Sequence, residues 1–143
     1  MINTKNKWDF DYKKYHLVNG CELSDEQLEI VKNICDYNVC ILNGAGGTGK
    51  SFSTQAVINM LKDNNKSFKL FSPTGKAAKV LSEYTNEHAT TIHRGLGYMP
   101  PDTWTYNADH QLDCDVLIID EFSMTDIFLF KRILDAINFD RTK

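Results

Sequence analysis

The eight residues Gly44-Ala45-Gly46-Gly47-Thr48-Gly49-Lys50-Ser51 match GxxxxGK[ST], the pattern of a phosphate-binding loop. Residues 39–42 form a short apolar run typical of a buried strand, and apolar residues recur at helical spacing after the loop. Glycines let backbone N–H groups turn toward phosphate oxygens, and the helix start adds partial positive charge. The alternative is a glycine-rich turn without a ligand, but this strand–loop–helix context favours a nucleotide site.

The chemistry of such a loop assigns roles to its side chains. Lys50 would reach the β and γ phosphates of ATP and take part in catalysis, and Ser51 would coordinate Mg²⁺. The backbone of the loop would hold the phosphates. The predicted cofactor-binding residues of the loop are therefore Gly44, Ala45, Gly46, Gly47, Thr48, Gly49, Lys50 and Ser51.

The chain alternates predicted helices and strands on both sides of the loop. Helices are expected at about 25–37 and 50–62, from Pro73 onward and from Ile127 onward, with further strands at 68–71 and 116–119. Residues 95–113 should form a surface excursion pinned by Trp104 or Tyr106. This alternation predicts an α/β fold of the P-loop (RecA-like) type, with a mainly parallel sheet and flanking helices.

Two carboxylates, Asp120 and Glu121, follow the apolar run at 116–119. Ligands of open α/β sheets bind at the carboxyl ends of the strands. Asp120 would hold Mg²⁺ together with Ser51, and Glu121 would orient or deprotonate the attacking water. Taken alone, such a pair more often caps the next helix. The phosphate loop earlier in the chain favours the catalytic interpretation, and charge balance near a triphosphate implies the metal.

The bulk composition is that of an ordinary globular protein. The chain has 143 residues, 42% of them hydrophobic and 24% charged, which suits a single domain. No apolar run approaches the roughly 20 residues of a membrane-spanning helix, so we expect a cytoplasmic protein with no membrane partner. The four cysteines form no CxxC pair, so neither a zinc site nor a redox motif is indicated.

The charge is unevenly distributed. Residues 62–94 contain six basic and three acidic side chains, so this stretch carries +3 and the remainder −6 of the total −3. Such a stretch is either a solvated face that arose by chance or a surface for an anionic partner.

With these motifs in place, about residues 23–125 resemble the N-terminal motor segment of RecD-like superfamily 1B DNA helicases, the exodeoxyribonuclease V alpha subunit type. In that family an LSxEQ segment supplies a glutamine that reads adenine, and Ser24-Asp25-Glu26-Gln27 matches it. Gln27 has two interpretations, because it could instead complete a capping box with Ser24. We favour the adenine role, since the resemblance extends on both sides.

Two more segments resemble motifs of this family that contact single-stranded DNA. Residues 72–78 are similar to motif Ia, although Thr74 could simply cap a helix, and residues 90–94 are similar to the next motif, although His93 alone would more often be structural. Residues 120–124 resemble the family's DEASM, with Phe122 in place of alanine. The basic stretch contains both DNA motifs. The resemblance therefore implies DNA contacts from Pro73, Thr74, Gly75, Lys76, Thr91, His93 and Arg94.

The resemblance also implies parts that these residues do not supply. Such a helicase continues with a sensor motif and a second RecA-like domain that carries an arginine finger, and nothing after Asp126 matches them. We expect an N-terminal arm or edge element at 1–22 and a truncated RecA-like domain at 23–143. The implied partners are single-stranded DNA, the missing second domain and helicase–nuclease subunits, with 5′ to 3′ movement in the full-length protein and low activity in this piece.

Two other classes remain open from the sequence. One is a P-loop ATPase that is not a helicase, such as a loader or a small-molecule kinase. The other is a nucleotide-binding module in which Glu121 is idle. The first class predicts no response of Thr74, His93 or Lys76 to an oligonucleotide, and the second predicts that Glu121→Gln changes nothing even in the full-length protein.

Overall fold

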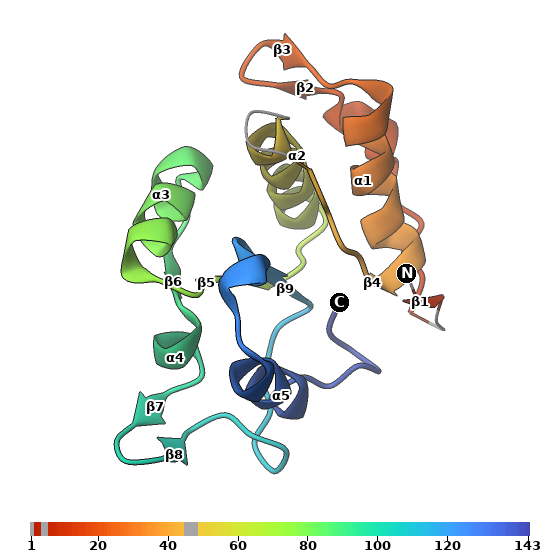
Figure 1. The fold of residues 1–143 in the computed structure, drawn as a ribbon. Coiled ribbons are helices and arrows are strands. Elements are labelled where there is room, and N and C mark those ends of the chain that lie inside the picture. Colours follow the sequence, from red (N-terminus) through yellow and green to blue (C-terminus); the bar gives the residue numbers. More distant parts are fainter. Residues whose placement is uncertain (1, 4–5, 45–48) are drawn as a thin grey trace. The chain divides into compact units, whose positions relative to one another are not determined.

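The computed structural model describes residues 2–3, 6–44 and 49–143, which belong to two compact units (Figure 1). Unit 1 comprises residues 1–67 together with Lys143, and unit 2 comprises residues 68–142. The predicted division into 1–22 and 23–143 stays a prediction.

Unit 1 is built mainly from two helices. In chain order its elements are β1 (Ile2–Asn3), the 3₁₀ helix η1 (Tyr12–Tyr15), β2 (Leu17–Val18), β3 (Cys21–Glu22), α1 (Asp25–Asp36), β4 (Tyr37–Val39) and α2 (Lys50–Asp63). Strand β1 pairs antiparallel with β4, and β2 pairs antiparallel with β3. Helix α2 buries Ala56, Ile58, Met60 and Leu61, and α1 buries Val31 and Cys35. This apolar interior anchors α2, whose first residue is the Lys50 of the phosphate loop.

The run before the loop differs from the buried parallel strand that its sequence predicts. Strand β4 ends at Val39 and pairs antiparallel, with β1. Ile41 is 86% exposed and Leu42 39% exposed. The prediction was wrong because an apolar run is buried only where neighbouring elements cover it. Within the described ranges, no strand is paired with residues 40–42.

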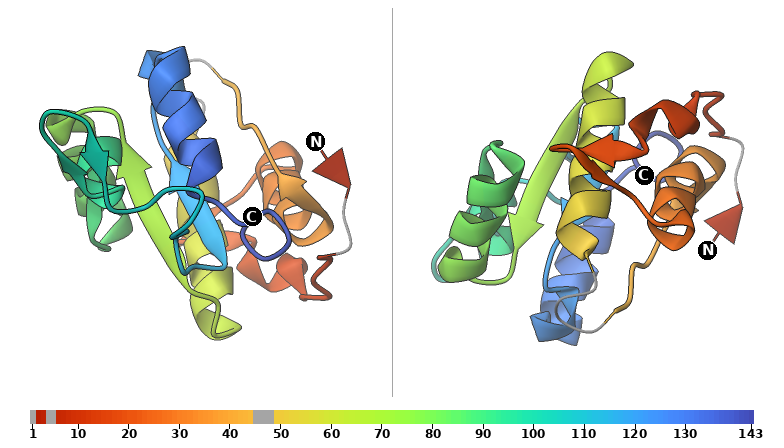
Figure 2. Two further views of the ribbon diagram at one scale, coloured as in Figure 1. Left: turned by 90° about the horizontal axis from the view of Figure 1, so that it is seen from below. Right: turned by 90° about the horizontal axis from the view of Figure 1, so that it is seen from above.

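Unit 2 contains the parallel sheet. Its elements are β5 (Phe68–Ser72), α3 (Gly75–Thr85), β6 (Ala89–Thr91), α4 (Ile92–Gly95), β7 (Tyr98–Met99), β8 (Thr103–Trp104), β9 (Val116–Ile119), η2 (Phe122–Met124) and α5 (Ile127–Asp135). The sheet has the order β6-β5-β9, and both pairings are parallel. Helix α5 lies along β9 (Figure 2). The predicted α/β class, a parallel sheet with flanking helices, is confirmed.

The core of unit 2 lies between the sheet, α4 and α5. Its buried residues are Phe71, Ile92, Leu96, Leu112, Cys114, Leu129, Ile133 and Ala136. Trp104 and Tyr106 are partly buried against this core, so the excursion at 95–113 is anchored as predicted. It also forms an unpredicted hairpin, in which β7 pairs antiparallel with β8. Strands of two residues leave no alternating pattern that sequence analysis could detect.

The predicted helix starts agree well with the structure. Helix α1 begins at Asp25 and α2 at Lys50, as their capping and apolar patterns indicate. Helix α3 begins at Gly75, two residues later than expected, because Thr74 is its N-cap. None of the helices in the described part of the chain combines the length and apolar character needed to cross a bilayer.

Candidate functional site

A cavity of about 260 Å³ in unit 1 brings together the described ends of the phosphate loop and the predicted adenine-reading residue. It is lined by Ser24, Glu26, Gln27, Ile30, Leu42, Asn43, Gly44, Lys50 and Ser53. The predicted loop residues Ala45, Gly46, Gly47 and Thr48 lie outside the described residues. Gln27 and the loop residues Gly44 and Lys50 come from two separate segments of the sequence, so their meeting at one cavity is a result of folding.

Lys50 is the first residue of α2, and its Nζ donates a hydrogen bond to the Gly44 carbonyl at 3.0 Å. The preceding Gly49 is the N-cap, with φ of +75°, a left-handed conformation that favours glycine. No side chain caps α2 in the described structure. The backbone N–H groups of its first turn therefore lack a side-chain acceptor there, which is the arrangement that binds anions at helix starts.

The Gln27 side chain completes the predicted capping box and also contacts the end of the phosphate loop. Its Oε1 accepts from the Ser24 backbone N–H at 2.8 Å, and its own N–H donates to Ser24 Oγ at 3.2 Å, so the capping box is present. At the same time its Nε2 donates to the Gly49 carbonyl at 3.0 Å. A Cβ added at Gly49 would overlap this amide. The side chain thus joins the start of α1 to the end of the phosphate loop, and its role toward adenine stays a prediction.

Ser53 is a lining residue that the sequence motifs did not single out. It lies on the buried side of α2, and its Oγ has no hydrogen-bond partner in the part of the chain that the structure describes. A buried hydroxyl without a partner is uncommon, because it loses the hydrogen bonds that water would make. The sequence signal that could have identified Ser53 is its position as a serine on the otherwise apolar, buried side of α2.

In unit 2 the three parallel strands end at one edge, and the remaining predicted site residues follow them there. Ser72 pairs with Thr91 and Phe71 with Ile119, so the three strands finish in register. Pro73, Thr74, Gly75 and Lys76 follow β5; Thr91 ends β6, and His93 and Arg94 lie in α4; Asp120 and Glu121 follow β9. The sheet therefore brings the predicted DNA-contacting segments and the two carboxylates to the same edge.

The two carboxylates differ in how they are held. The Asp120 N–H donates to the Phe71 carbonyl at 3.0 Å, which ties the residue to β5. Its Oδ1 accepts from the Glu121 N–H at 2.9 Å, and its Oδ2 accepts from the Tyr84 hydroxyl at 3.5 Å. Glu121 is exposed, with φ of +54°, a conformation that costs a non-glycine residue about 1 kcal/mol or more. One carboxylate is oriented, and the other is presented to solvent.

Neither side chain of this acidic pair caps the next α-helix, as the alternative interpretation of the sequence would require. Glu121 is the N-cap of η2 but makes no side-chain capping hydrogen bond. Helix α5 is capped by Asp126, whose Oδ1 accepts from the Leu129 N–H at 2.7 Å. Neither Asp120 nor Glu121 caps α5, so both remain available for the predicted hydrolytic role.

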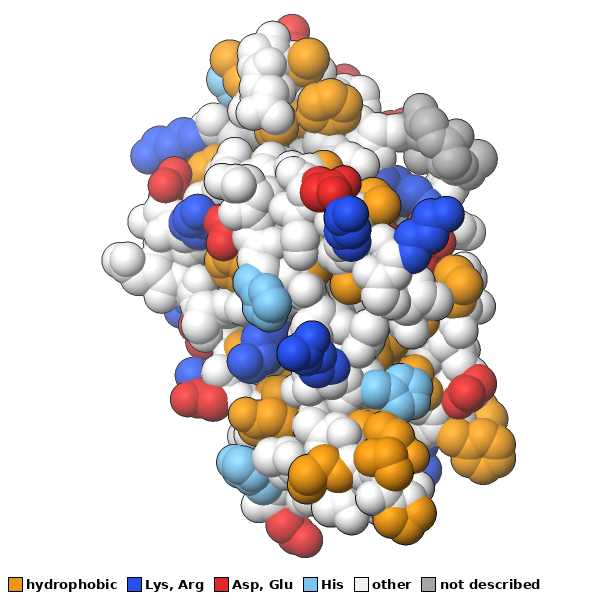
Figure 3. Space-filling view, turned by 90° about the vertical axis from the view of Figure 1, so that its left-hand side faces the viewer, with side chains coloured by type: hydrophobic (Ala, Val, Ile, Leu, Met, Phe, Trp, Pro, Cys, Tyr) orange, Lys and Arg blue, Asp and Glu red, His pale blue; other side chains and the backbone are white. Residues whose placement is uncertain are grey.

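The threonines of the DNA-like motifs are both helix caps. Thr74 Oγ1 accepts from the Ala77 N–H and Thr91 Oγ1 from the Arg94 N–H, each at 3.2 Å. The capping interpretation of Thr74 is therefore confirmed as geometry. Lys76 and Arg94 are exposed, and the face in Figure 3 carries Lys, Arg and His side chains across its middle. Cationic side chains are thus presented to solvent at the positions predicted for phosphate contacts.

Comparison with known proteins supplies the family. The model of a family described as an AAA domain matches residues 27–143. The ATP-dependent RecD2 DNA helicase of Deinococcus radiodurans is 37% identical over 115 residues, which are 80% of this chain and 16% of that protein. The RecBCD enzyme subunit RecD of Buchnera aphidicola subsp. Acyrthosiphon pisum is 37% identical over 122 residues, 71% of this chain and 20% of that protein.

A more distant relative also belongs to the RecD subunits. The RecBCD enzyme subunit RecD of Mycolicibacterium smegmatis is 28% identical over 138 residues, 79% of this chain and 25% of that protein. The chain thus spans between 16% and 25% of the length of these three curated relatives.

Proposed function

Since the chain belongs to the AAA-domain family of P-loop proteins and to its RecD-like helicases, we propose that it is the ATP-binding and single-stranded-DNA-binding segment of a DNA helicase motor. The observation that carries the proposal is the common edge of the parallel sheet. There the DNA-like segments that follow β5 and β6 begin beside the carboxylates that follow β9.

ATP and Mg²⁺ suit the side chains that are present. Lys50 would contact the β and γ phosphates and Gln27 the adenine, with residues 44–51 around the phosphates. Ser51 and Asp120 would hold Mg²⁺, because hydroxyl and carboxylate oxygens are the ligands this ion prefers. When bound, ATP would supply the γ-phosphoryl group that is transferred to water, with ADP as the leaving group. Glu121 would accept a proton from the attacking water at its exposed carboxylate, and the hydrogen bonds of Asp120 would keep its carboxylate in one orientation.

Single-stranded DNA is the proposed polymer substrate. Lys76 and Arg94 would neutralise phosphates, and the backbone at Pro73, Gly75 and the end of β6 would position the strand. Movement in the 5′ to 3′ direction, a second RecA-like domain and association with helicase–nuclease subunits are part of the same proposal. The greater length of the relatives supports a further domain, and the name RecBCD enzyme subunit of one relative supports association with other subunits. The polarity is only what the family resemblance implies.

The proposal is tested by equilibrium binding to the purified chain. A fluorescent ATP analogue with Mg²⁺ should bind, and Lys50→Ala should weaken its binding at least tenfold, because the lysine contributes charge-assisted contacts to two phosphates. Labelled oligo-dT should bind with lower affinity in the double variant of Lys76→Ala and Arg94→Ala. Lys14→Ala, on η1, is the matched surface control. If Lys50→Ala binds the analogue as well as the parent does, the nucleotide assignment is wrong.

Turnover should nevertheless be slow in these 143 residues alone. An arginine finger contributes about 10³ to 10⁵ in rate in P-loop GTPases, and the resemblance assigns one to a second domain. Steady-state ATPase measurements with and without single-stranded DNA check this, and robust DNA-stimulated hydrolysis would contradict it.

A further inference from the structure

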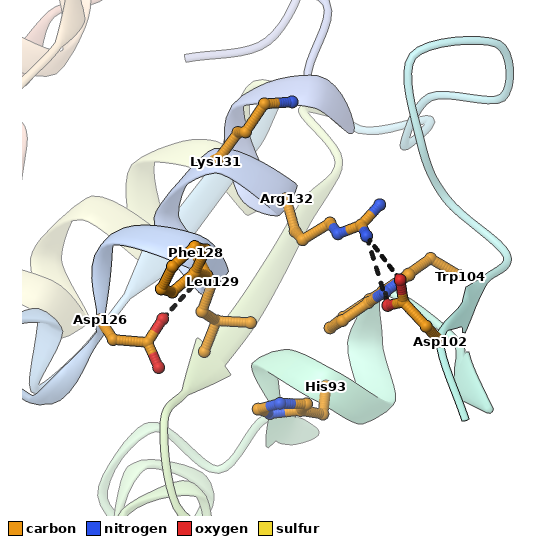
Figure 4. A pocket seen from close by; sticks show the side chains of 8 residues that line it. All are labelled: His93, Asp102, Trp104, Asp126, Phe128, Leu129, Lys131 and Arg132. Atoms are coloured by element: carbon orange, nitrogen blue, oxygen red, sulfur yellow. Dashed lines mark hydrogen bonds and ion pairs between the residues drawn. The ribbon is translucent and has the colours of Figure 1, made fainter. Parts of the chain in front are cut away.

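A second cavity, of about 430 Å³, lies within unit 2 between α4, the β7–β8 hairpin and α5 (Figure 4). It is lined by His93, Asp102, Trp104, Asp126, Phe128, Leu129, Lys131 and Arg132. Among these, only His93 was assigned a role by the sequence motifs. The other residues come from segments on either side of the strand β9, so the cavity exists only in the folded chain.

Aromatic rings from three elements border this cavity. The ring centroid of His93 lies 5.6 Å from that of Trp104 and 5.5 Å from that of Tyr98, and the Tyr98 and Trp104 centroids are 4.8 Å apart. Phe128 approaches from α5 and is 81% exposed. A large aromatic ring that lines a cavity and is exposed to water would be stabilised if a flat partner stacked on it, because stacking removes apolar surface from water.

The charged residues around the rings are largely paired with one another. Arg132 Nη2 donates to both Asp102 carboxylate oxygens at 3.2 Å, and its guanidinium lies 5.3 Å from the Trp104 ring. The Trp104 indole N–H donates to the same Asp102 at 2.9 Å. Lys131 Nζ donates to Asp135 at 2.7 Å. Because these charges are balanced, the cavity favours a flat, uncharged aromatic group over a phosphate.

We propose that this cavity receives a base of single-stranded DNA, which stacks on the rings of His93, Trp104 and Phe128. The inference rests on the proposed function, because it assumes that a DNA strand runs along the neighbouring edge of the sheet. His93 joins the two regions. It shares the four-residue helix α4 with Arg94, so a strand whose phosphate meets Arg94 can place an adjoining base against the His93 ring. Base stacking of this kind tolerates any sequence.

The chain offers a direct spectroscopic test, because it contains two tryptophans, Trp8 in unit 1 and Trp104 at the cavity. In a Trp8→Phe variant, Trp104 is the only tryptophan. Oligo-dT of about ten nucleotides should quench its fluorescence as the anisotropy of a label on the DNA rises. An abasic oligonucleotide of equal length keeps the phosphates but has no bases, and it should bind without quenching Trp104.

A matched pair of variants on α5 gives the energetic test. Phe128→Ala removes an exposed lining ring, and Ile127→Ala removes a neighbour that is 73% exposed and does not line the cavity. Base–aromatic stacking is worth about 1–3 kcal/mol per base, so Phe128→Ala should weaken oligo-dT binding about fivefold or more. Ile127→Ala should leave the affinity unchanged. Both substitutions replace exposed side chains, so neither should unfold the chain.

Three results would overturn the inference. Equal affinities of both variants, with unchanged Trp104 emission in saturating oligo-dT, would leave DNA binding intact and exclude a base from the cavity. No rise in anisotropy with the parent chain would remove the DNA part of the proposed function as well. Self-association that is lost only in Phe128→Ala, with DNA affinity unchanged, would make the cavity a protein contact.

Discussion

At the scale of single residues, Gln27 has more than one use in the folded chain. Its side chain completes a capping box with Ser24 and also holds the Gly49 carbonyl at 3.0 Å. The capping box is predictable from the sequence, because all of its atoms lie within four consecutive residues. The contact with Gly49 is not, because it joins residues 22 positions apart and depends on how α1 packs beside α2.

Two substitutions separate these uses. Gln27→Ala should reduce the preference for ATP over GTP, because only an amide at this position can read the adenine edge in the proposed site. Ser24→Ala should lower the free energy of unfolding by about 1 kcal/mol, as the loss of a helix cap does, while the preference for ATP remains. Competition between the nucleotides, together with urea unfolding, measures both effects. If Gln27→Ala keeps the same preference as Ser24→Ala, Gln27 does not read adenine.

The cysteines provide a pH-dependent prediction. Cys35 and Cys114 are buried, and burial raises the pKa of each thiol from 9.0 to about 11. Between these values the folded state binds more protons than the unfolded state, so stability is full below about pH 9 and falls as the pH rises toward 11. Urea midpoints across this range check the trend. Cys35→Ala should reduce the slope, and Cys21→Ser, at an exposed position, should not.

Thiol labelling gives an independent control. The thiolate is the reactive form, so a disulfide reagent near neutral pH should modify Cys21 first and reach Cys35 and Cys114 only after unfolding. Rapid labelling of either buried thiol in the native chain would contradict the assigned burial.

At the scale of elements, the helix starts and the parallel strands β5 and β9 were predictable, and the surroundings of the apolar run before the loop were not. A capping residue such as Ser24 marks a helix start, because its side chain bonds to the backbone of the first turn. The residue type and its position can be seen in the sequence itself. The apolar run at 39–42 was misjudged because burial depends on distant neighbours. The β7–β8 hairpin was missed because its strands have two residues each. The aromatic cavity was missed for the same reason, since it needs that hairpin to meet α5.

The N-cap of α5 by the Asp126 side chain can be tested by substitution. Asp126→Ala removes the acceptor for the Leu129 N–H and should lower the free energy of unfolding by about 1 kcal/mol. Glu121→Gln is the matched control, since the Glu121 side chain makes no capping hydrogen bond. Thermal unfolding of both variants measures the difference. Equal destabilisation would mean that Glu121 stabilises this segment as much as Asp126 does, which would contradict the assignment of the cap to Asp126.

At the scale of the whole molecule, the predicted roles are divided between the two units. Unit 1 carries the phosphate loop and Gln27, and unit 2 carries the carboxylates and the DNA-like segments. The α/β class followed from the alternation of helix and strand patterns. The RecD-like family followed from short motifs, because each motif states a chemical requirement within a few residues. The common edge of the sheet required the structure, since only the register of β5 with β6 and β9 brings the segments together.

The most direct test of the central claim is a two-step NMR titration of the isotope-labelled chain. ATP with Mg²⁺ is added first, and oligo-dT second. We predict that the nucleotide shifts amide resonances in residues 44–51, and that the oligonucleotide then shifts those in residues 74–94. Oligo-dT that leaves residues 74–94 unchanged, while the nucleotide shifts the loop, would contradict the helicase assignment and leave a nucleotide-binding protein of another class.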